Sequence, residues 1–286
     1  MINNTRPKII DLSFPISNSP AGTPAFQQVS IEYEDHRQGA AQVEQLIGVS
    51  PSLLRNGEGW AVETFTKLGT HSSTHVDAPL HYNSTIQGQP AQSIDELPLD
   101  WFFAPGVKLD FRHKADGEAI TSAEIQVELE RIGHTLQSCD IVLMWAGRDE
   151  LFGRPDYWLH GPGVTAEATP WLFEQGVRVM GIDAWGWDQP LPMQAEKAKK
   201  RNHPGIFWAA HQADLPYSQI ERLCNLGAIP PTKFTVACFP LRIERGGNGN
   251  YARRSRAGGV GRQHIHQAEG AGDQPPTGRK SRALGR

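Results

Sequence analysis

The segment LGTHSSTHVDAPLHY, residues 68–82, constrains the fold of this chain more than any other feature. Three histidines and one aspartate fall within eleven residues of it: His71, His75, Asp77 and His81. Imidazole nitrogens and carboxylate oxygens are the usual ligands of Zn²⁺ and related ions. A lone histidine is more often a hydrogen-bonded core or surface residue, but burying four such groups without partners costs several kcal/mol. The spacing therefore predicts a metal site held by His71, His75 and Asp77.

The backbone must fold back between His71 and Asp77 if their side chains are to meet at one ion. Fully extended, this stretch would span roughly 20 Å, whereas each ligand atom must lie about 2 Å from the ion. Residues 72–74 suit a turn or a single helical turn, which would bring the flanking histidines together. Pro79 then ends that turn and carries His81 past the ligands on a rigid segment. Three protein ligands leave a position open for water, as in catalytic metal sites.

Strand-like and helix-like segments alternate along the rest of the chain. Thr121 and Glu124 form a capping box before an amphipathic helix that ends near Gly133, and Thr165 begins a second helix that ends near Gly176. We expect strands at 8–13, 28–34, 61–68, 106–111, 140–145, 177–183, 206–210 and 234–239. This alternation predicts an α/β domain with mixed strand directions.

The last part of the chain, 246–286, differs from the rest. It is rich in Gly and Arg and has almost no apolar periodicity. Such a segment cannot bury enough apolar surface to offset its ordering entropy. We therefore place the domain at 1–245 and predict that 246–286 is a disordered or aberrant tail. The alternative is an arm that binds nucleic acid; because no folded basic module accompanies it, we expect no nucleic-acid partner.

The overall composition is that of an ordinary soluble protein, with 38% hydrophobic residues and a formal net charge of -3. The sequence has no apolar run of about 18 residues that would span a membrane, and it does not begin with the apolar core of a secretion signal. Its three cysteines form no CxxC pair, which indicates reduced thiols. We therefore expect a cytoplasmic protein without a membrane partner.

A second cluster of chemically active residues lies at WAAHQADLPYSQIERLCN, 208–225. His211, Gln212 and Glu221 could complete the metal sphere or bind substrate. Each also has a simpler interpretation, such as a solvated helix residue for Glu221 or a structural histidine for His211. Several aromatic residues could either fill the core or wall an aromatic pocket: Trp60, Trp101, Phe102, Phe103, Trp185 and Trp187. The chain has no P-loop, GxSxG elbow or GxGxxG fingerprint.

The histidine motif resembles that of a known family. His71-Ser-Ser-Thr-His75-Val-Asp77-Ala-Pro-Leu-His81 is similar to the HxGTHxDxPxH motif of the cyclase family of metal-dependent hydrolases, which includes bacterial kynurenine formamidase and isatin hydrolase. The resemblance covers about residues 8 to 245 and implies a swivelling β/β/α fold and a homodimer or higher homo-oligomer. It implies the metal ligands His71, His75, Asp77, Gln212 and Glu221, and the catalytic residues His81 and His211.

Two features depart from the family pattern. Ser73 stands where the motif has Gly, which puts the local turn geometry in question. The family also closes with a short strand after a segment like FPLRIERG, and here the Gly/Arg-rich run stands in its place. We therefore expect this edge strand to be missing.

The resemblance implies hydrolysis of a non-peptide amide C–N bond, in an aryl formamide or a cyclic amide, by metal-activated water. The cofactor would be a divalent metal, Zn or Mn, between which the ligands do not choose. His81 would act as the acid and base, and the partner would be a small aromatic amide. Two alternatives remain: a non-catalytic protein that binds metal and ligand on the same fold, and a non-haem Fe(II) oxygenase-type enzyme with the same two-His, one-carboxylate set.

Overall fold

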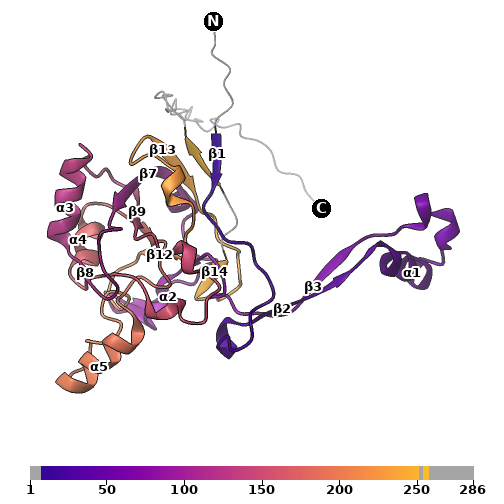
Figure 1. Ribbon diagram of the computed structural model, residues 1–286, viewed down its shortest axis with the longest axis horizontal. Helices are drawn as coiled ribbons and strands as arrows, with labels where there is room; N and C mark the ends of the chain where they lie inside the picture. Colours follow the sequence, from indigo (N-terminus) through magenta and orange to yellow (C-terminus); the bar gives the residue numbers. More distant parts are fainter. Residues whose placement is uncertain (1–7, 251–253, 258–286) are drawn as a thin grey trace, which may run out of the picture.

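The computed structural model describes residues 8–250 and 254–257 and is built around one mixed sheet (Figure 1). Four neighbouring strands, β7, β9, β11 and β12, run parallel, and the remaining neighbours in the sheet pair antiparallel. This confirms the predicted α/β fold with mixed strand directions. Within the described residues the sheet has nine strands, in the spatial order β1 (Lys8–Asp11), β15 (Arg254–Ala257), β13 (Phe234–Ala237), β7 (Phe103–Asp110), β9 (Ile141–Trp145), β11 (Val179–Ile182), β12 (Ser218–Glu221), β4 (His75–Asp77) and β14 (Asn248–Asn250).

The chain also forms five helices and three separate strand pairs within the described residues. The helices are α1 (His36–Ile47), α2 (Pro79–Tyr82), α3 (Ser122–Arg131), α4 (Ala168–Glu174) and α5 (Leu191–Arg201). The strand pairs are β2 (Val29–Glu34) with β3 (Val62–Leu68), β5 (Thr85–Ile86) with β6 (Gln89–Pro90), and β8 (Ala119–Ile120) with β10 (Gly163–Val164). Within the described ranges, no helix combines the length and apolar character needed to cross a bilayer.

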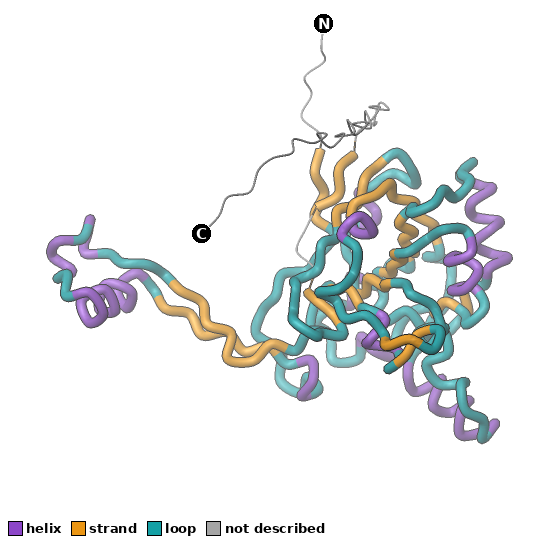
Figure 2. The backbone as a smooth tube through the Cα atoms, turned by 180° about the vertical axis from the view of Figure 1, so that it is seen from behind, coloured by secondary structure: helices purple, strands orange, loops and turns teal. Residues whose placement is uncertain are grey.

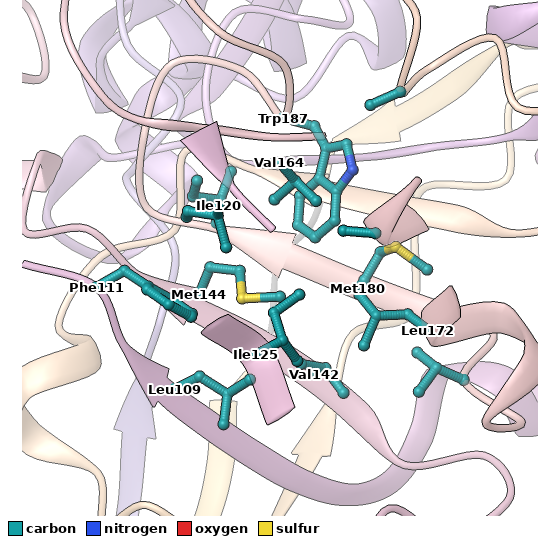
Figure 3. Close-up of a cluster of buried hydrophobic side chains, with 14 of the residues drawn as sticks. Leu109, Phe111, Ile120, Ile125, Val142, Met144, Val164, Leu172, Met180 and Trp187 are labelled. Atoms are coloured by element: carbon teal, nitrogen blue, oxygen red, sulfur yellow. The ribbon is translucent and has the colours of Figure 1, made fainter. Parts of the chain in front are cut away.

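Strand β9 separates two buried clusters of hydrophobic side chains. Val142 and Met144 lie in the cluster that α3 and α4 cover, which Figure 3 shows. Ile141 and Leu143 lie in the cluster on the opposite side, and all four side chains are fully buried. Burying one such side chain contributes about 1.5–3 kcal/mol. A strand that is buried on both faces has a continuous apolar sequence, and DIVLMW is therefore a central strand.

The helix predicted after Thr121 is confirmed as α3. The Thr121 hydroxyl accepts a hydrogen bond from the Glu124 backbone N–H at 3.3 Å, and the Glu124 carboxylate accepts one from the Thr121 N–H at 3.0 Å. This reciprocal pair satisfies two N–H groups at the helix start. Ile125 and Leu129 lie one turn apart and are both buried against the sheet. The predicted second helix is α4, which begins at Ala168, later than Thr165.

The strand predicted at 206–210 is wrong, because this segment forms a series of turns. Trp208 has a φ of 63°, in the left-handed region. An extended strand cannot continue through such a residue, although the apolar composition of the segment favoured one. The turn affects the site, because after it His211 is buried while Gln212 is exposed.

The sheet continues beyond residue 245, where the domain was predicted to end. β14 pairs with β4 at one edge of the sheet, and β15 lies between β1 and β13 near the other. Strand pairing uses main-chain groups and needs no apolar periodicity, which is why composition alone did not reveal it. The edge strand that we expected to be missing is therefore present as β14. Residues 251–253 and 258–286 of the predicted tail lie outside the described residues.

One hairpin leaves the body of the molecule as an extended arm (Figures 1 and 2). Strands β2 and β3 pair antiparallel, and α1 lies at the far end of the hairpin. Asp35 caps α1 through a capping box with Gln38, and Gly48 ends the helix in the left-handed conformation. We call residues 29–68 the arm. The arm ends at Leu68, shortly before the histidine motif begins at His71.

Candidate metal centre

Strand β4 places the middle of the motif inside the sheet, between β12 and β14. Successive strand residues point to opposite faces, so His75 and Asp77 share one face while Val76 enters the core on the other. Strand β12 pairs antiparallel with β4, and Glu221 lies directly opposite His75. Because opposed residues in such a pair lie on the same face, the pairing register brings Glu221 to His75 and Asp77.

A bend before β4 returns His71 to this same face. The buried Ser73 hydroxyl donates a hydrogen bond to the Phe14 carbonyl oxygen at 2.9 Å, which ties the bend to the N-terminal segment. Ser73 is not among the residues with a positive φ. The bend therefore does not need the freedom of glycine, and the departure from the family motif at this position introduces no backbone strain.

The hydrogen bonds of His75 fix which of its ring nitrogens faces the cluster. Its Nδ1 lies 2.7 Å from the Ser73 carbonyl oxygen. A carbonyl oxygen can only accept, so Nδ1 carries the proton and Nε2 of the neutral ring has a free lone pair. Burial lowers the pKa of His75 to about 4, against the opposing charge of Glu221. Near pH 7 the ring therefore presents an electron-pair donor to its neighbours.

The three predicted ligand atoms converge on one point. His71 Nδ1 lies 3.0 Å from His75 Nε2 and 3.3 Å from Asp77 Oδ1, and the latter two atoms are 3.6 Å apart. Ligands held about 2.0–2.1 Å from a tetrahedral ion lie about 3.3 Å from one another. The separations in the structure are therefore those that a single tetrahedral ion requires.

Asp77 accepts no well-formed hydrogen bond that would explain its burial, although the buried Asn248 side chain lies near it and favours its charged form. Both carboxylate oxygens are fully buried and, within the described residues, accept no hydrogen bond. Burial first, and then the charge of Glu221, raise the pKa of Asp77 well above its usual value. Leaving a buried polar group unsatisfied costs about 1–3 kcal/mol, and more for a charged group. A cation between Asp77 and the imidazoles would remove this cost, so the residues present fit a metal ion.

Glu221 connects this cluster to a second pair of residues. One oxygen of Glu221 lies 3.6 Å from His75 Nε2, and the other lies 3.2 Å from His211 Nε2 and accepts the Trp187 N–H at 2.9 Å. The opposite side of the His211 ring donates to Asp188 through Nδ1. Burial lowers the pKa of His211, but the carboxylates of Asp188 and Glu221 outweigh it and raise the pKa to about 10. Glu221 is thus held by a charged imidazole, which lowers its own pKa to about 2 against the effect of burial.

Helix α2 places His81 at the mouth of the cluster. Pro79 occupies the first turn of this helix, where its missing N–H is not needed. The His81 ring lies with its centroid 4.2 Å from that of His71 and 5.1 Å from that of Trp208. Burial, followed by the charge of His211, lowers the pKa of His81 to about 3. Its ring atoms also come within 4.8 Å of ligand atoms of His71 and Asp77, so His81 borders the same space.

The structure does not bring Gln212 into this cluster. Its side chain is exposed, and the amide Nε2 lies 3.5 Å from the Tyr82 carbonyl oxygen. His211 and Gln212 are adjacent in sequence, yet only His211 is buried beside Glu221. Asp188 was not anticipated from the sequence, because its contact with His211 joins residues that no local motif links.

A cavity of about 440 Å³ opens from the cluster and has the size of a small-molecule site. His71, His81, His211, Glu221 and Arg222 contribute its polar lining. Its aromatic walls are Phe26, Trp158, Trp185, Phe207 and Trp208. Of the aromatic residues singled out from the sequence, Trp185 therefore lines the cavity, whereas Phe102 and Trp187 are fully buried in the two core clusters.

A family model and two curated proteins match the sequence of this chain. A family model described as "Putative cyclase" matches residues 10–189. The kynurenine formamidase of Erythrobacter litoralis is 33% identical over 161 residues, which is 54% of this chain and 65% of that protein. The kynurenine formamidase of Salinibacter ruber is 26% identical over 244 residues, 83% of this chain and 92% of that protein.

A similarity to a solved structure confirms the fold. Isatin hydrolase A from Ralstonia solanacearum superposes with a TM-score of 0.67 at 22% identity, covering 88% of this chain and 92% of that one. At 22% identity, the match shows that the two chains share the same arrangement of strands and helices. It bears out the fold class that the histidine motif implied.

Proposed function

Because the chain belongs to the cyclase family, we propose that it is a metal-dependent hydrolase that cleaves the C–N bond of a small non-peptide amide. The observation that carries this proposal is the convergence of His71, His75 and Asp77 around one point, with both Asp77 oxygens buried and unpaired. The names of the similar proteins, kynurenine formamidase and isatin hydrolase, support an aryl formamide or a cyclic aromatic amide as the substrate.

The proposed metal ligands are His71, His75 and Asp77. Glu221 is a further proposed ligand of the same ion, because one of its oxygens lies 3.6 Å from His75 Nε2. Gln212 remains a predicted ligand, but it would have to leave the Tyr82 carbonyl to approach the ion. This mixed set of imidazole and carboxylate suits Zn²⁺ or Mn²⁺. When bound, such an ion polarises a carbonyl group and lowers the pKa of water.

His81 is the proposed acid and base of the reaction. The ring is neutral near pH 7 and lies beside His71 and Asp77, which places its nitrogen where it can take a proton from the attacking water. The same ring then returns the proton to the leaving nitrogen. An aniline-type nitrogen leaves more readily than an alkyl amine, which favours aromatic amides. The proposed part of His211 is to hold Glu221 in place, as hydrogen-bonded partners of metal ligands commonly do.

The cavity supports an aromatic substrate of modest size. Its aromatic residues and the imidazoles of His71 and His81 line the same space of about 440 Å³. Aromatic side chains contribute large apolar contact areas, so a single aromatic ring can be held against Trp185 or Trp208 while its amide reaches the metal centre. The partner of the site is thus a small aromatic amide.

The test is hydrolysis of N-formyl aromatic amines and cyclic amides by the full chain loaded with Zn²⁺ or Mn²⁺. His75→Ala and Asp77→Ala should lose both bound metal and hydrolysis, whereas His203→Ala, which changes an exposed histidine outside the cavity, should lose neither. Full activity in the metal-free protein would refute the proposal. Ligand binding without turnover would favour a non-catalytic protein, and oxygen consumption with added Fe(II) would favour an oxygenase.

We also propose that the protein is a homodimer or higher homo-oligomer that assembles through the arm. Five large apolar side chains of the arm are between 47% and 78% exposed: Tyr33, Leu46, Ile47, Leu53 and Phe65. Apolar groups gathered on a projecting element commonly mark a protein interface. Phe26, which precedes the arm in the sequence, lines the cavity.

Light scattering of the purified full chain tests this assembly. Replacing Leu46 and Leu53 together by Glu should dissociate the oligomer, because charged side chains are depleted from interface cores. Leu99→Glu, at an exposed leucine outside the arm, should leave the mass unchanged. A wild-type protein that is monomeric at high concentration would contradict the proposal.

A further inference from the structure

We propose that Arg222 forms a carboxylate-binding subsite beside the metal centre, which selects aromatic ligands that carry a carboxylate. This inference rests on the proposed function, because the bound cation is what leaves the charge of Arg222 without a counterpart. Arg222 follows Glu221 at the end of β12 and lines the same cavity as His71. The histidine motif does not include it.

The guanidinium group of Arg222 is held in place by uncharged partners. Its Nη1 donates to the His71 carbonyl oxygen, and its Nε donates to the Trp185 carbonyl oxygen at 3.3 Å. The centre of the guanidinium also lies 4.9 Å from the Trp185 ring centroid, which is a cation–π contact. Arg222 is only 4% exposed. The charged group is therefore rigid, largely desolvated and fixed at the cavity wall.

No carboxylate in the described part of the chain forms an ion pair with Arg222 within 4.0 Å. A buried charge without a partner is strongly unfavourable. The acidic groups that act on Arg222 over longer distances include Glu221 and Asp77, and these two negative charges would be offset by a divalent cation. With the metal bound, one positive charge remains at the cavity wall, and an anionic ligand would balance it.

The shape and surroundings of this charge favour a carboxylate on an aromatic ring. A guanidinium presents parallel N–H groups that match the two oxygens of a carboxylate. Within the described residues, the Nη2 group of Arg222 donates no hydrogen bond. The Trp185 ring adjoins the guanidinium, and Phe207 and Trp208 line the same cavity, so the cavity suits a flat apolar group.

Two sources of such a carboxylate fit the proposed reaction. The substrate can carry its own carboxylate next to the amide on the ring. Alternatively, hydrolysis of a cyclic aromatic amide breaks the C–N bond, forms a C–O bond from water, and leaves a carboxylate joined to the aryl amine. The chemistry that Arg222 recognises is the same in both cases, and the experiment separates them.

The first arm of the experiment compares formanilide with 2-formamidobenzoate, its ortho-carboxylate analogue, as substrates of the Zn²⁺-loaded full chain. The readout is the ratio of the two kcat/KM values. Arg222→Gln should lower the preference for the carboxylate about 10- to 100-fold, since a hydrogen bond to a charged group is worth about 1.5–3 kcal/mol. Arg222→Lys keeps the charge but not the fork and should lower it less.

Arg178→Gln is the matched control. Arg178 also donates to main-chain carbonyls, those of Phe173 and Val177, and also stacks on an aromatic ring, but it lies outside the cavity. Its replacement removes the same kinds of contact and should leave the substrate ratio unchanged. Metal content and circular dichroism are measured for each variant, and Arg222→Lys carries the test if Arg222→Gln fails to fold.

The second arm measures binding of 2-aminobenzoate and aniline by calorimetry, with and without Zn²⁺. A carboxylate preference in both arms assigns the subsite to the substrate, and a preference in binding alone assigns it to the product. If formanilide and its analogue are not hydrolysed at all, the proposed function fails on these substrates, and the calorimetry still tests Arg222. Equal ratios and equal affinities in wild type and Arg222→Gln would overturn the inference.

Discussion

Replacing Asp77 by Asn should stabilise the metal-free protein and destabilise the metal-loaded one. In the metal-free state, burial raises the pKa of Asp77 well above 3.8. The unfolded chain releases this proton near pH 3.8 while the folded chain retains it, so the metal-free protein loses stability as the pH rises above that value. Asn carries no charge and avoids this loss.

The size of the effect follows from the charge of buried Asp77, because Asn also leaves a buried oxygen without a partner and lacks only the ionised form. Removing the charge should make metal-free Asp77→Asn more stable at pH 7 by about 1–3 kcal/mol, the cost of one unsatisfied buried group. At about 2–4 °C per kcal/mol, the melting temperature should rise by roughly 2–12 °C. Metal at 1,000 times its dissociation constant stabilises the wild type by about 4.1 kcal/mol, and the variant, lacking a ligand, should gain much less. The order of stability should therefore reverse.

Calorimetric melting of both proteins, with chelator and with Zn²⁺, measures this reversal. Asp100→Asn serves as the control, because Asp100 is exposed and away from the cavity, and it should melt like the wild type in both conditions. The reasoning is refuted if Asp77→Asn melts lower than the wild type in chelator by as much as it does with metal. Asp77 would then have an ordinary structural role.

Three further predictions concern residues around and outside the metal centre. His81→Ala should lower kcat about 100- to 10,000-fold with bound metal unchanged; loss of metal, seen by elemental analysis, would instead make His81 a ligand. Asp188→Asn removes the carboxylate that holds His211 and should weaken Zn²⁺ binding about 10- to 100-fold in a chelator competition, and unchanged affinity would show that the pair does not support the site. Burial raises the pKa of Asp116, but hydrogen bonds led by that of His160 outweigh it and lower the pKa to about 2. The resulting stability is present above pH 3.8 and lost as the pH falls through about 2. Asp116→Asn should therefore cost at most about 1 kcal/mol in urea unfolding at pH 6, because the side chain is 40% exposed, and a difference that persists at pH 2 would contradict this origin.

The bend at 72–74 in the candidate metal centre was predicted from the sequence, whereas strand β4, which follows it, was not. His75 and Asp77 are two residues apart, so one strand presents both to the same face, and the small polar residues between His71 and His75 allow the necessary bend. The central strand β9 was equally predictable from its unbroken apolar run. In each case the relevant contacts lie within a few residues along the chain.

Features that depend on distant contacts were not accessible from one sequence. Asp188 reaches His211 across a turn, and the charge of Arg222 is significant only because no carboxylate within the described residues pairs with it. Strand β14 forms through main-chain pairing with β4 in a Gly-rich segment that lacks a strand pattern. Conversely, the apolar composition of 206–210 suggested a strand, and the left-handed Trp208 prevents it.

The projection of the arm from the body is another feature that the sequence alone did not predict. Its strands have recognisable sequences, and the capping box of α1 is local. That the hairpin projects from the sheet depends on the absence of packing partners within the described chain, which no residue pattern encodes. Leu46 and Leu53 become candidates for an interface only because the structure shows that both side chains are exposed.

Calorimetric titration of the metal-stripped full chain with Zn²⁺ tests the central claim most directly. The convergence of His71, His75 and Asp77 predicts one ion bound tightly per chain, and replacing any of the three by Ala should abolish tight binding. A wild-type chain that takes up no ion, or a triple variant that binds Zn²⁺ as tightly as the wild type, would contradict the account.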